Sequence, residues 1–530
     1  MADDPNDRRA ELQRRARDLA AMRGAASKPA QAEPEAPAAE PEAPAAVPAA
    51  VPAAAPAADG ARSGGLLELL VSLFKPKPAQ PPQPVPVPIA AEGPSFTILV
   101  AALSGDTDGQ AATQLNQVLN ARPAFKVKAV PRVYQLDRLD DPALVAGVSL
   151  NTRHAVAEED ADLLVWGEFG KDGYRLRLAT ASNDDERAAA FGTTTRIELP
   201  AELGEGPSNL LYAACLAAVE VPTEAHRNSI RRLMPAAAAG VESLAAKPPV
   251  QMSMGQQRSC QLVFGHVATI NAMVVPAEET NLWFDKAINA YRQAQRRLAR
   301  TDPTWENGLI HKHIGAVLSA KAERSKDPAP LLEEAIKEWR QAVECLPRAL
   351  MPQEWASAQV RLGVALYRLD LKTGQTELLR ESVQALQATL QVYSRTETPQ
   401  RWAEVMHNIA QVLEVYGDQL KSTEVLKRSI DACHSVLEIR TRERGPLAWA
   451  ATQNTLGSAL FLLDRHSTGA GHLTEAEQAL AAALEVFQNH GAKGPAKVAA
   501  KNLGHVRKLA ETRKTRQVIE PHWLDDPDSK

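Results

Sequence analysis

The chain has 530 residues, a length that suggests roughly three domains of ordinary size. Its formal net charge of −4 excludes an overall positive field that would attract nucleic acid or an anionic membrane. The cysteines lie far apart and lack the paired spacing of a disulfide framework or a thiolate zinc site (Cys215, Cys260, Cys345 and Cys433). We therefore predict no metal ion and no cofactor.

Residues 1–94 read as a disordered Ala/Pro-rich region. The first 24 residues are charged and have no apolar core, so they do not form a secretory signal. Between residues 25 and 61 proline blocks helix formation and alanine offers little surface to bury. No run in the chain reaches the roughly 18 apolar residues of a spanning helix. A cytoplasmic protein is the expectation.

An apolar decamer, residues 65–74, interrupts this region between two proline-rich linkers. As a helix it would be about 15 Å long, half of a bilayer core. Three roles stay open: docking on the folded part of the same chain, docking on a partner, or weak contact with a membrane surface. In each case the docking side chains would be Leu66, Leu67, Leu69, Leu70, Leu73 and Phe74.

A small α/β domain is predicted over residues 95–205. A continuously apolar strand comes first, and the turn "SGDTDG" follows it, with Asp106 or Thr107 available to cap the next helix. A helix over 110–121, an alternating strand over 125–133 and a helix over 151–161 come next. "DLLVWGEF" predicts a second buried strand, "KDG" a hairpin turn and "YRLRLATA" its partner, before a last strand in "TTTRIELP". Two connecting helices are expected over 206–250.

The strand patterns of this segment resemble the amino-terminal α/β domain of TolB. The matching features, in order, lie at 96–106, 125–132 and 161–179. The resemblance implies a fold and a module that assembles with other proteins, and it implies no catalytic residue.

The "SGDTDG" turn also raises the alternative of an anion or small-ligand site. It stands between a strand and a helix, where backbone N–H groups and the helix dipole favour anions. However, it matches neither GxGxxG nor a Walker loop, so an ordinary turn is the favoured interpretation.

From about residue 251 to residue 515 the sequence repeats a helical hairpin. Trp355, Trp402 and Trp449 are spaced by 47 residues, and each stands three residues after a proline. A small residue recurs later in the same helix, namely Gly315, Gly363, Ala410, Gly457 and Gly504. Such self-similarity is typical of an α-solenoid, in which each hairpin buries its apolar face only against its neighbours. We expect about five hairpins, then a lone helix near 496–512 and a tail over 516–530.

The Leu-Gly and small-residue columns resemble tetratricopeptide (TPR) repeats, although the 47-residue unit is longer than the usual TPR. The tryptophans and Gly363, Gly457 and Gly504 are then structural residues where helices meet. The resemblance implies a concave groove along the first helices. Its predicted lining, acidic in the middle and basic at the C-terminal end, comprises Tyr367, Glu404, His407, Gln411, Glu414, Asn454, Phe461, Lys501, His505 and Lys508.

The sequence thus predicts a small α/β domain followed by an all-α solenoid of TPR-like hairpins. We expect a non-enzymatic scaffold or adaptor that binds protein or peptide partners through the solenoid groove, and no nucleic acid. Two alternatives stay open. One is a regulatory or sensor protein whose α/β domain binds a small ligand, and the other is a peripheral membrane-associated assembly factor anchored by helix 65–74.

Overall fold

The computed structural model describes residues 95–136, 141–182, 189–192, 194–221, 223–467 and 471–519, and side chains as far as residue 513. The predicted disordered region 1–94, its docking helix 65–74 and residues 520–530 of the tail lie outside the described residues. Predictions made for those parts stay predictions.

Five strands form one mixed sheet in the order β2-β1-β3-β4-β5. They are β1 (Phe96–Ala102), β2 (Phe125–Val133), β3 (Leu163–Gly170), β4 (Gly173–Ala179) and β5 (Ile197–Leu199). β1 pairs in parallel with β2 and with β3, whereas β3, β4 and β5 pair antiparallel. β1 is buried on both faces, as its continuous apolar run predicts.

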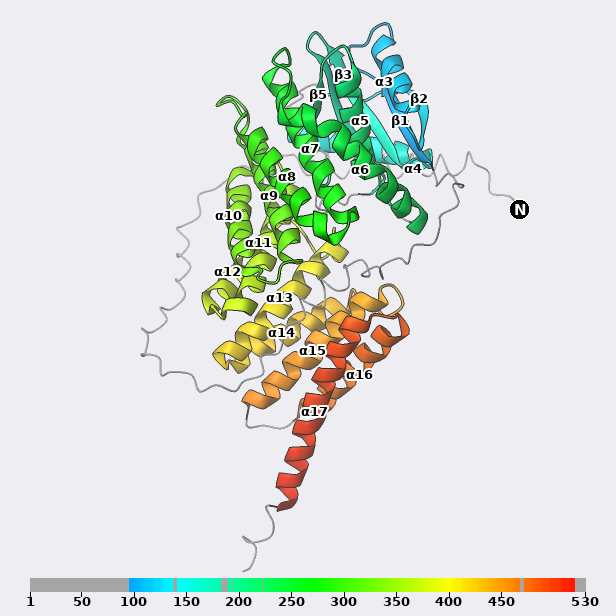
Figure 1. Ribbon diagram of the computed structural model, residues 1–530. Coiled ribbons are helices and arrows are strands. Elements are labelled where there is room, and N and C mark those ends of the chain that lie inside the picture. The colour runs from blue at the N-terminus through cyan, green and yellow to red at the C-terminus, as the bar shows by residue number, and fades with distance from the viewer. Residues whose placement is uncertain are drawn as a thin grey trace, which may run out of the picture. The chain divides into compact units, whose positions relative to one another are not determined.

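Helices cover the two faces of this sheet unequally (Figure 1). α3 (Gln110–Asn120) and α5 (Glu205–Ala218) pack on the face that carries Ile98, Val100 and Val165. α4 (Pro142–Glu158) packs on the opposite face, against Leu99 and Trp166. α4 starts well before the predicted position of residue 151, because Asp141 caps it by accepting the amide hydrogen of Ala143 at 3.0 Å.

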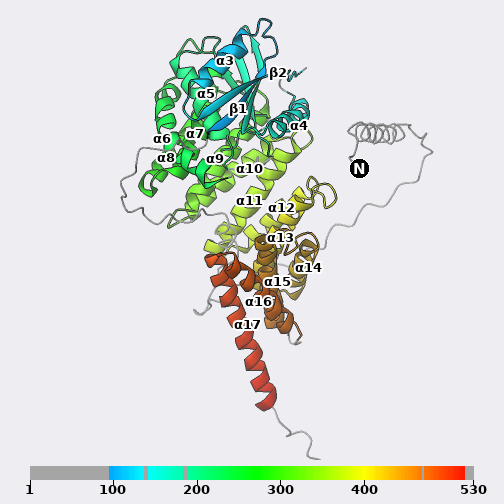
Figure 2. The same ribbon diagram turned by 90° about the vertical axis from the view of Figure 1, so that its right-hand side faces the viewer.

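α6 (Glu224–Ala246) leads into five helical hairpins and a further helix. The hairpins are α7/α8 (Met254–Val274, Ala277–Gln295), α9/α10 (Thr304–Ala322, Ala329–Cys345), α11/α12 (Pro352–Thr373, Thr376–Thr389), α13/α14 (Pro399–Leu420, Thr423–Leu437) and α15/α16 (Pro446–His466, Leu473–Asn489). α17 (Lys493–Ile519) follows. Each first helix packs on its own second helix, which in turn packs on the next first helix (Figures 1 and 2). The predicted fold class, a small α/β domain followed by a helical solenoid, is confirmed.

The repeating glycines mark the places where the two helices of a hairpin touch. A Cβ atom built on Gly363 or Gly457 would lie 2.7 or 2.6 Å from Cγ of Leu386 or Leu480. No real Cβ fits at such a distance, so glycine's cost in helix propensity of about 1 kcal/mol is accepted there. We call the position of the repeating glycine the slot. In the intervening hairpin the slot holds Ala410, and the equivalent of Leu386 and Leu480 in the second helix is the smaller Cys433. Slot and facing residue therefore change size together.

Candidate functional site

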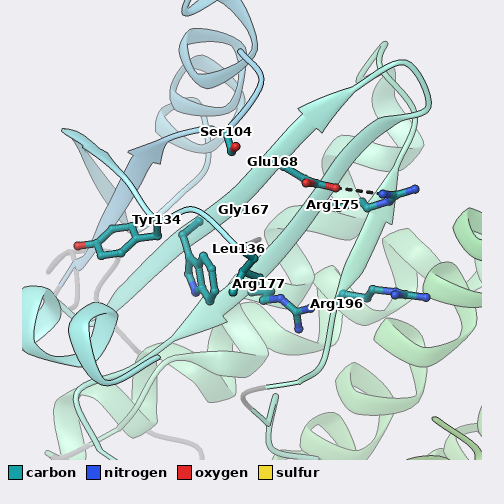
Figure 3. Close-up of a pocket in the computed structure, with 9 residues that line it drawn as sticks. Ser104, Tyr134, Leu136, Gly167, Glu168, Arg175, Arg177 and Arg196 are labelled. Atoms are coloured by element: carbon teal, nitrogen blue, oxygen red, sulfur yellow. Dashed lines mark hydrogen bonds and ion pairs between the residues drawn. The ribbon is translucent and has the colours of Figure 1, made fainter. Parts of the chain in front are cut away.

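The α/β domain carries a small hollow on one face of its sheet (Figure 3). Ser104 follows β1, Trp166 and Glu168 lie in β3, Arg175 and Arg177 in β4, and Arg196 directly precedes β5; Tyr134, Leu136 and Gly167 complete the lining. The antiparallel register pairs Trp166 with Arg177 and Glu168 with Arg175, which brings these four side chains to one face. The hollow lies beside Ser104, where the sequence suggested a small-ligand alternative.

Each arginine of this hollow already has a partner within the protein. Arg175 pairs with Glu168 at 3.0 Å, the dashed contact of Figure 3. Arg177 donates to the carbonyl of Thr194 at 2.7 Å, and Arg196 lies 2.9 Å from Glu306 of α9. An anionic ligand would have to compete with these contacts.

The "SGDTDG" turn supplies its own anion to the helix that follows it. The Asp106 carboxylate accepts the amide hydrogens of Ala111 at 3.2 Å and of Ala112 at 2.8 Å. Asp108 accepts that of Gln110 at 3.1 Å, although the residue at the N-cap position itself is Gly109. The N–H groups that a phosphate would need at this helix N-terminus are therefore occupied by carboxylates.

Half of the side chains of the predicted groove are buried between neighbouring first helices. Those with almost no exposure are Tyr367, His407, Gln411, Glu414 and Asn454. Their polar atoms connect successive hairpins: Ser458 of α15 donates to Glu414 of α13, and Asn502 of α17 donates to Asn454 at 3.5 Å. In this conformation they join the repeats to one another, and their role in binding a partner stays a prediction.

Burial also changes the ionisation of this inner layer. The pKa of Glu414 is raised to about 8, because burial disfavours the carboxylate more than the hydrogen bond from Ser458 favours it. Burial lowers the pKa of His407 well below its usual value, with a smaller contribution from the Arg440 charge. Both groups are therefore mostly uncharged near neutral pH.

The remaining predicted groove residues are accessible. Glu404 and Phe461 are partly exposed, and Lys501, His505 and Lys508 are exposed on α17. The ring of Phe461 stacks on His505 at 6.4 Å between centroids, and the guanidinium of Arg465 lies 5.8 Å from the Phe461 centroid. The C-terminal end of the array thus presents a cationic surface with one aromatic ring.

The periodic tryptophans contact arginines of the preceding turns. Arg348, Arg395 and Arg442 lie over Trp355, Trp402 and Trp449, with distances to the ring centroids of 5.7, 5.4 and 5.7 Å. Gly363 and Gly457 sit in tight helix contacts as described above. Gly504 differs, because no other described helix places an atom within 4 Å of a Cβ built there.

One contact, between the residues that precede β5 and the helices of the solenoid, cannot be predicted from the sequence patterns. Residues 189–192 and 194–196, which we name the lead-in segment because they precede β5, pack on α7, α9 and α11 of the solenoid. The ring of Phe191 lies 4.4 Å from that of His266 in α7, and a Cβ on Gly192 would lie 2.9 Å from an oxygen of Glu354 in α11. Local periodicity cannot reveal this contact, since its two sides are separated by 75 residues (Phe191 and His266) and by 162 residues (Gly192 and Glu354) of sequence.

Two features are absent from the described residues, a metal site and a membrane-spanning helix. No group of three or more His, Cys, Asp or Glu side chains there has the arrangement of a metal site. None of the helices in that part of the chain is long and apolar enough to cross a membrane.

Comparison with known proteins gives little further information. No family model and no curated protein matches the chain. Among solved structures, a circular tandem repeat protein with novel repeat topology and enhanced subunit contact surfaces is 15% identical. The match covers 59% of this chain and 84% of that one, with a TM-score of 0.25, too low for any argument about this protein.

Proposed function

We propose that this protein is a non-enzymatic scaffold or adaptor that binds a protein or peptide partner along the first helices of its repeat array. The finer assignments, TPR-like repeats and a TolB-like module, and the cytoplasmic location are part of the same proposal. Repeat arrays of stacked hairpins present extended surfaces that suit peptides or proteins bound over a long contact.

The observation that carries this proposal is the exposed cationic surface at the C-terminal end of the array. Lys501, His505 and Lys508 are exposed there beside the ring of Phe461. An acidic peptide with an apolar side chain would complement both the charge and the ring. The membrane-anchored alternative depends on residues 65–74, outside the described part.

The small-ligand alternative for the α/β domain has weaker support. The hollow beside Ser104 gives a location, but Arg175, Arg177 and Arg196 are each engaged by the protein. A ligand would first have to break an ion pair or a hydrogen bond, so we prefer the scaffold function.

The test is affinity purification of the full chain with quantitative mass spectrometry. In the double variant Lys501→Glu/Lys508→Glu, we expect the captured amount of at least one partner to fall roughly tenfold, because the reversed charges repel an acidic segment. The matched control is Lys427→Glu, an exposed lysine on α14.

An unchanged partner set in the double variant would contradict the proposal. A parallel deletion of 65–74 separates the roles of the two regions: partners lost only in that deletion depend on the apolar decamer and not on the array surface.

A further inference from the structure

We propose that Arg440 forms a carboxylate-binding site at the junction of α13 and α15, and that this site takes an acidic side chain of the peptide bound along the first helices. The inference rests on the proposed function, because it assigns a second contact to the same peptide. It differs from the cationic surface of α17 in being built from a partly buried guanidinium and the hydroxyl group that holds it.

Arg440 stands at a position of the repeat that is apolar in the neighbouring hairpins. At the equivalent positions, spaced by 47 residues, the chain has Leu346, Tyr393 and Phe487, which are almost fully buried. A periodic core gains free energy from an apolar side chain at such a place, and a charged group costs free energy there. Packing alone therefore does not account for the arginine.

Two residues beside Arg440 also replace apolar residues of other repeats. The position of His407 is occupied by Val360 in α11, and that of Thr452 by Val405 in α13. The Thr452 hydroxyl oxygen accepts a hydrogen bond from Nη1 of Arg440 at 3.3 Å and lies 3.4 Å from Nδ1 of His407. Polar residues thus come together at one junction of the array, where α13 packs on α15.

The guanidinium of Arg440 is held by a neutral acceptor. Its bond to Thr452 uses one of its several N–H donors, and no carboxylate of the described residues forms an ion pair with it. Glu404, whose charge acts on Arg440, is itself paired with Arg401 at 3.2 Å. Burial lowers the pKa of Arg440 more than the Glu404 charge raises it. A carboxylate brought by a ligand would therefore stabilise the charged guanidinium.

The same network leaves a buried acceptor unused. Nε2 of Gln411 lies 3.1 Å from Nε2 of His407, whereas Oε1 of Gln411 has no hydrogen bond within the described residues, although the side chain is fully buried. The polar groups of this junction are therefore not matched to one another, as they would be if the network served packing alone.

Fluorescence anisotropy with the full chain tests the site. The probe is the labelled peptide Ser-Glu-Phe-Ser-Glu-Ser-Glu-Ser, and the comparison peptide carries glutamine in place of each glutamate. The readout is the ratio of the two dissociation constants. We expect the unaltered chain to bind the glutamate peptide roughly tenfold more tightly, and Arg440→Tyr to lower this ratio roughly fivefold. Tyrosine is chosen because it is the residue of the preceding repeat, Tyr393.

Arg428→Gln is the matched control, since it removes an exposed arginine from α14 of the same hairpin. The ratio for this variant should stay within about twofold of that for the unaltered chain. Equal effects of the two arginine substitutions would show that only net charge matters and would overturn the inference. A ratio that Arg440→Tyr leaves unchanged would do the same.

The double variant Lys501→Glu/Lys508→Glu distinguishes this inference from the proposed function. A ratio lowered by the double variant and not by Arg440→Tyr overturns the Arg440 site and keeps the peptide-binding surface. A ratio lowered by neither, or equal binding of both peptides by the unaltered chain, contradicts both.

Free glutarate, added at the concentration of the peptide, tests the other source of a carboxylate. We expect it to leave the peptide bound, because it lacks the further contacts of a peptide along the first helices. Displacement of the peptide would assign the site to a small dicarboxylate and overturn the peptide as its ligand.

Arg440→Lys decides the matter where Arg440→Tyr does not keep the helical circular dichroism of the unaltered chain. Lysine keeps the charge but lacks the planar fork that holds both oxygens of a carboxylate, so the ratio should fall roughly threefold. An unchanged ratio in Arg440→Lys would then show that no carboxylate binds the guanidinium, and would overturn the inference.

Discussion

Glu414 is a carboxyl group buried between two repeats. It lies on α13, accepts a hydrogen bond from Ser458 of α15, and has the Asp418 charge nearby. Its pKa is raised to about 8 from an ordinary value of 4.5, chiefly by burial. The folded protein therefore binds a proton there between about pH 4.5 and pH 8 that the unfolded chain releases.

The Glu414→Gln variant should show how this proton affects stability. Because the pKa is higher in the folded state, the contribution of Glu414 is fully present below about pH 4.5 and is lost as pH rises to about 8. Glutamine stays neutral at all pH values. We expect the free energy of unfolding of the variant, relative to the unaltered chain, to rise by about 1.4 kcal/mol per pH unit between pH 5 and pH 8.

Urea denaturation followed by circular dichroism at pH 5, 6, 7 and 8 measures this difference. Glu404→Gln serves as the control, since Glu404 lies on the same helix but is partly exposed and paired with Arg401 at 3.2 Å. A stability difference for Glu414→Gln that does not change with pH would contradict the prediction.

At the scale of the helical hairpin, one arginine per repeat connects the turn to two neighbours. Arg395 lies over Trp402, the residue near the start of the next first helix, and pairs with Glu438 at the end of the following second helix. Arg442 repeats the arrangement with Trp449 and with Glu485 at 2.5 Å. Tryptophan recurs with the 47-residue period because it is one side of this contact.

Arg395→Ala should lower the free energy of unfolding by about 1 kcal/mol. The cation–π contact accounts for roughly 0.5–1 kcal/mol at an exposed site, and the ion pair, about half exposed, contributes little beyond that. Urea denaturation measures the change. Arg428→Ala, which removes an exposed arginine of α14, should stay within about 0.5 kcal/mol of the unaltered chain. Equal effects of the two substitutions would rule out a special role for Arg395.

At the scale of the whole array, α17 covers the last hairpin with a polar outer surface. Leu503 and Val506 are buried in the same cluster as Leu463 and Leu480. On its other side α17 exposes Lys508 and leaves the Gly504 slot without a facing residue in the described chain. A helix that is apolar on one side and polar on the other protects the end of a solenoid from further stacking.

Truncation after residue 490 should therefore make the protein self-associate. Loss of α17 exposes the apolar cluster that Leu503 and Val506 cover, and exposed patches of this kind promote association. Size-exclusion chromatography with light scattering should show a larger molar mass per particle than for the full chain. Truncation after residue 519 keeps α17 and serves as the control. An unchanged association state after the shorter truncation would refute the protective role of α17.

Features with a local or periodic cause could be predicted from the sequence. The strand at 96–102 is continuously apolar because both faces of the sheet are covered, and the "KDG" turn joins β3 to β4 as expected. The 47-residue spacing of Trp355, Trp402 and Trp449 predicts the stacked hairpins, since each repeat must present the same surfaces to its neighbours. The predicted start of α4 is too late, because the Asp141 cap precedes the clear helical pattern, and α17 continues to Ile519, into the predicted tail.

What the tertiary structure decided is which of these surfaces remain accessible. The same periodic pattern that places His407 and Gln411 on a first helix does not say whether the next helix will cover them, and it does. Nor does it place Phe191 against His266 or Glu306 beside Arg196, because these contacts join segments that share no period. Periodicity is a property of neighbouring residues and fixes the repeat, whereas accessibility depends on the packing of distant segments and follows only from the folded chain.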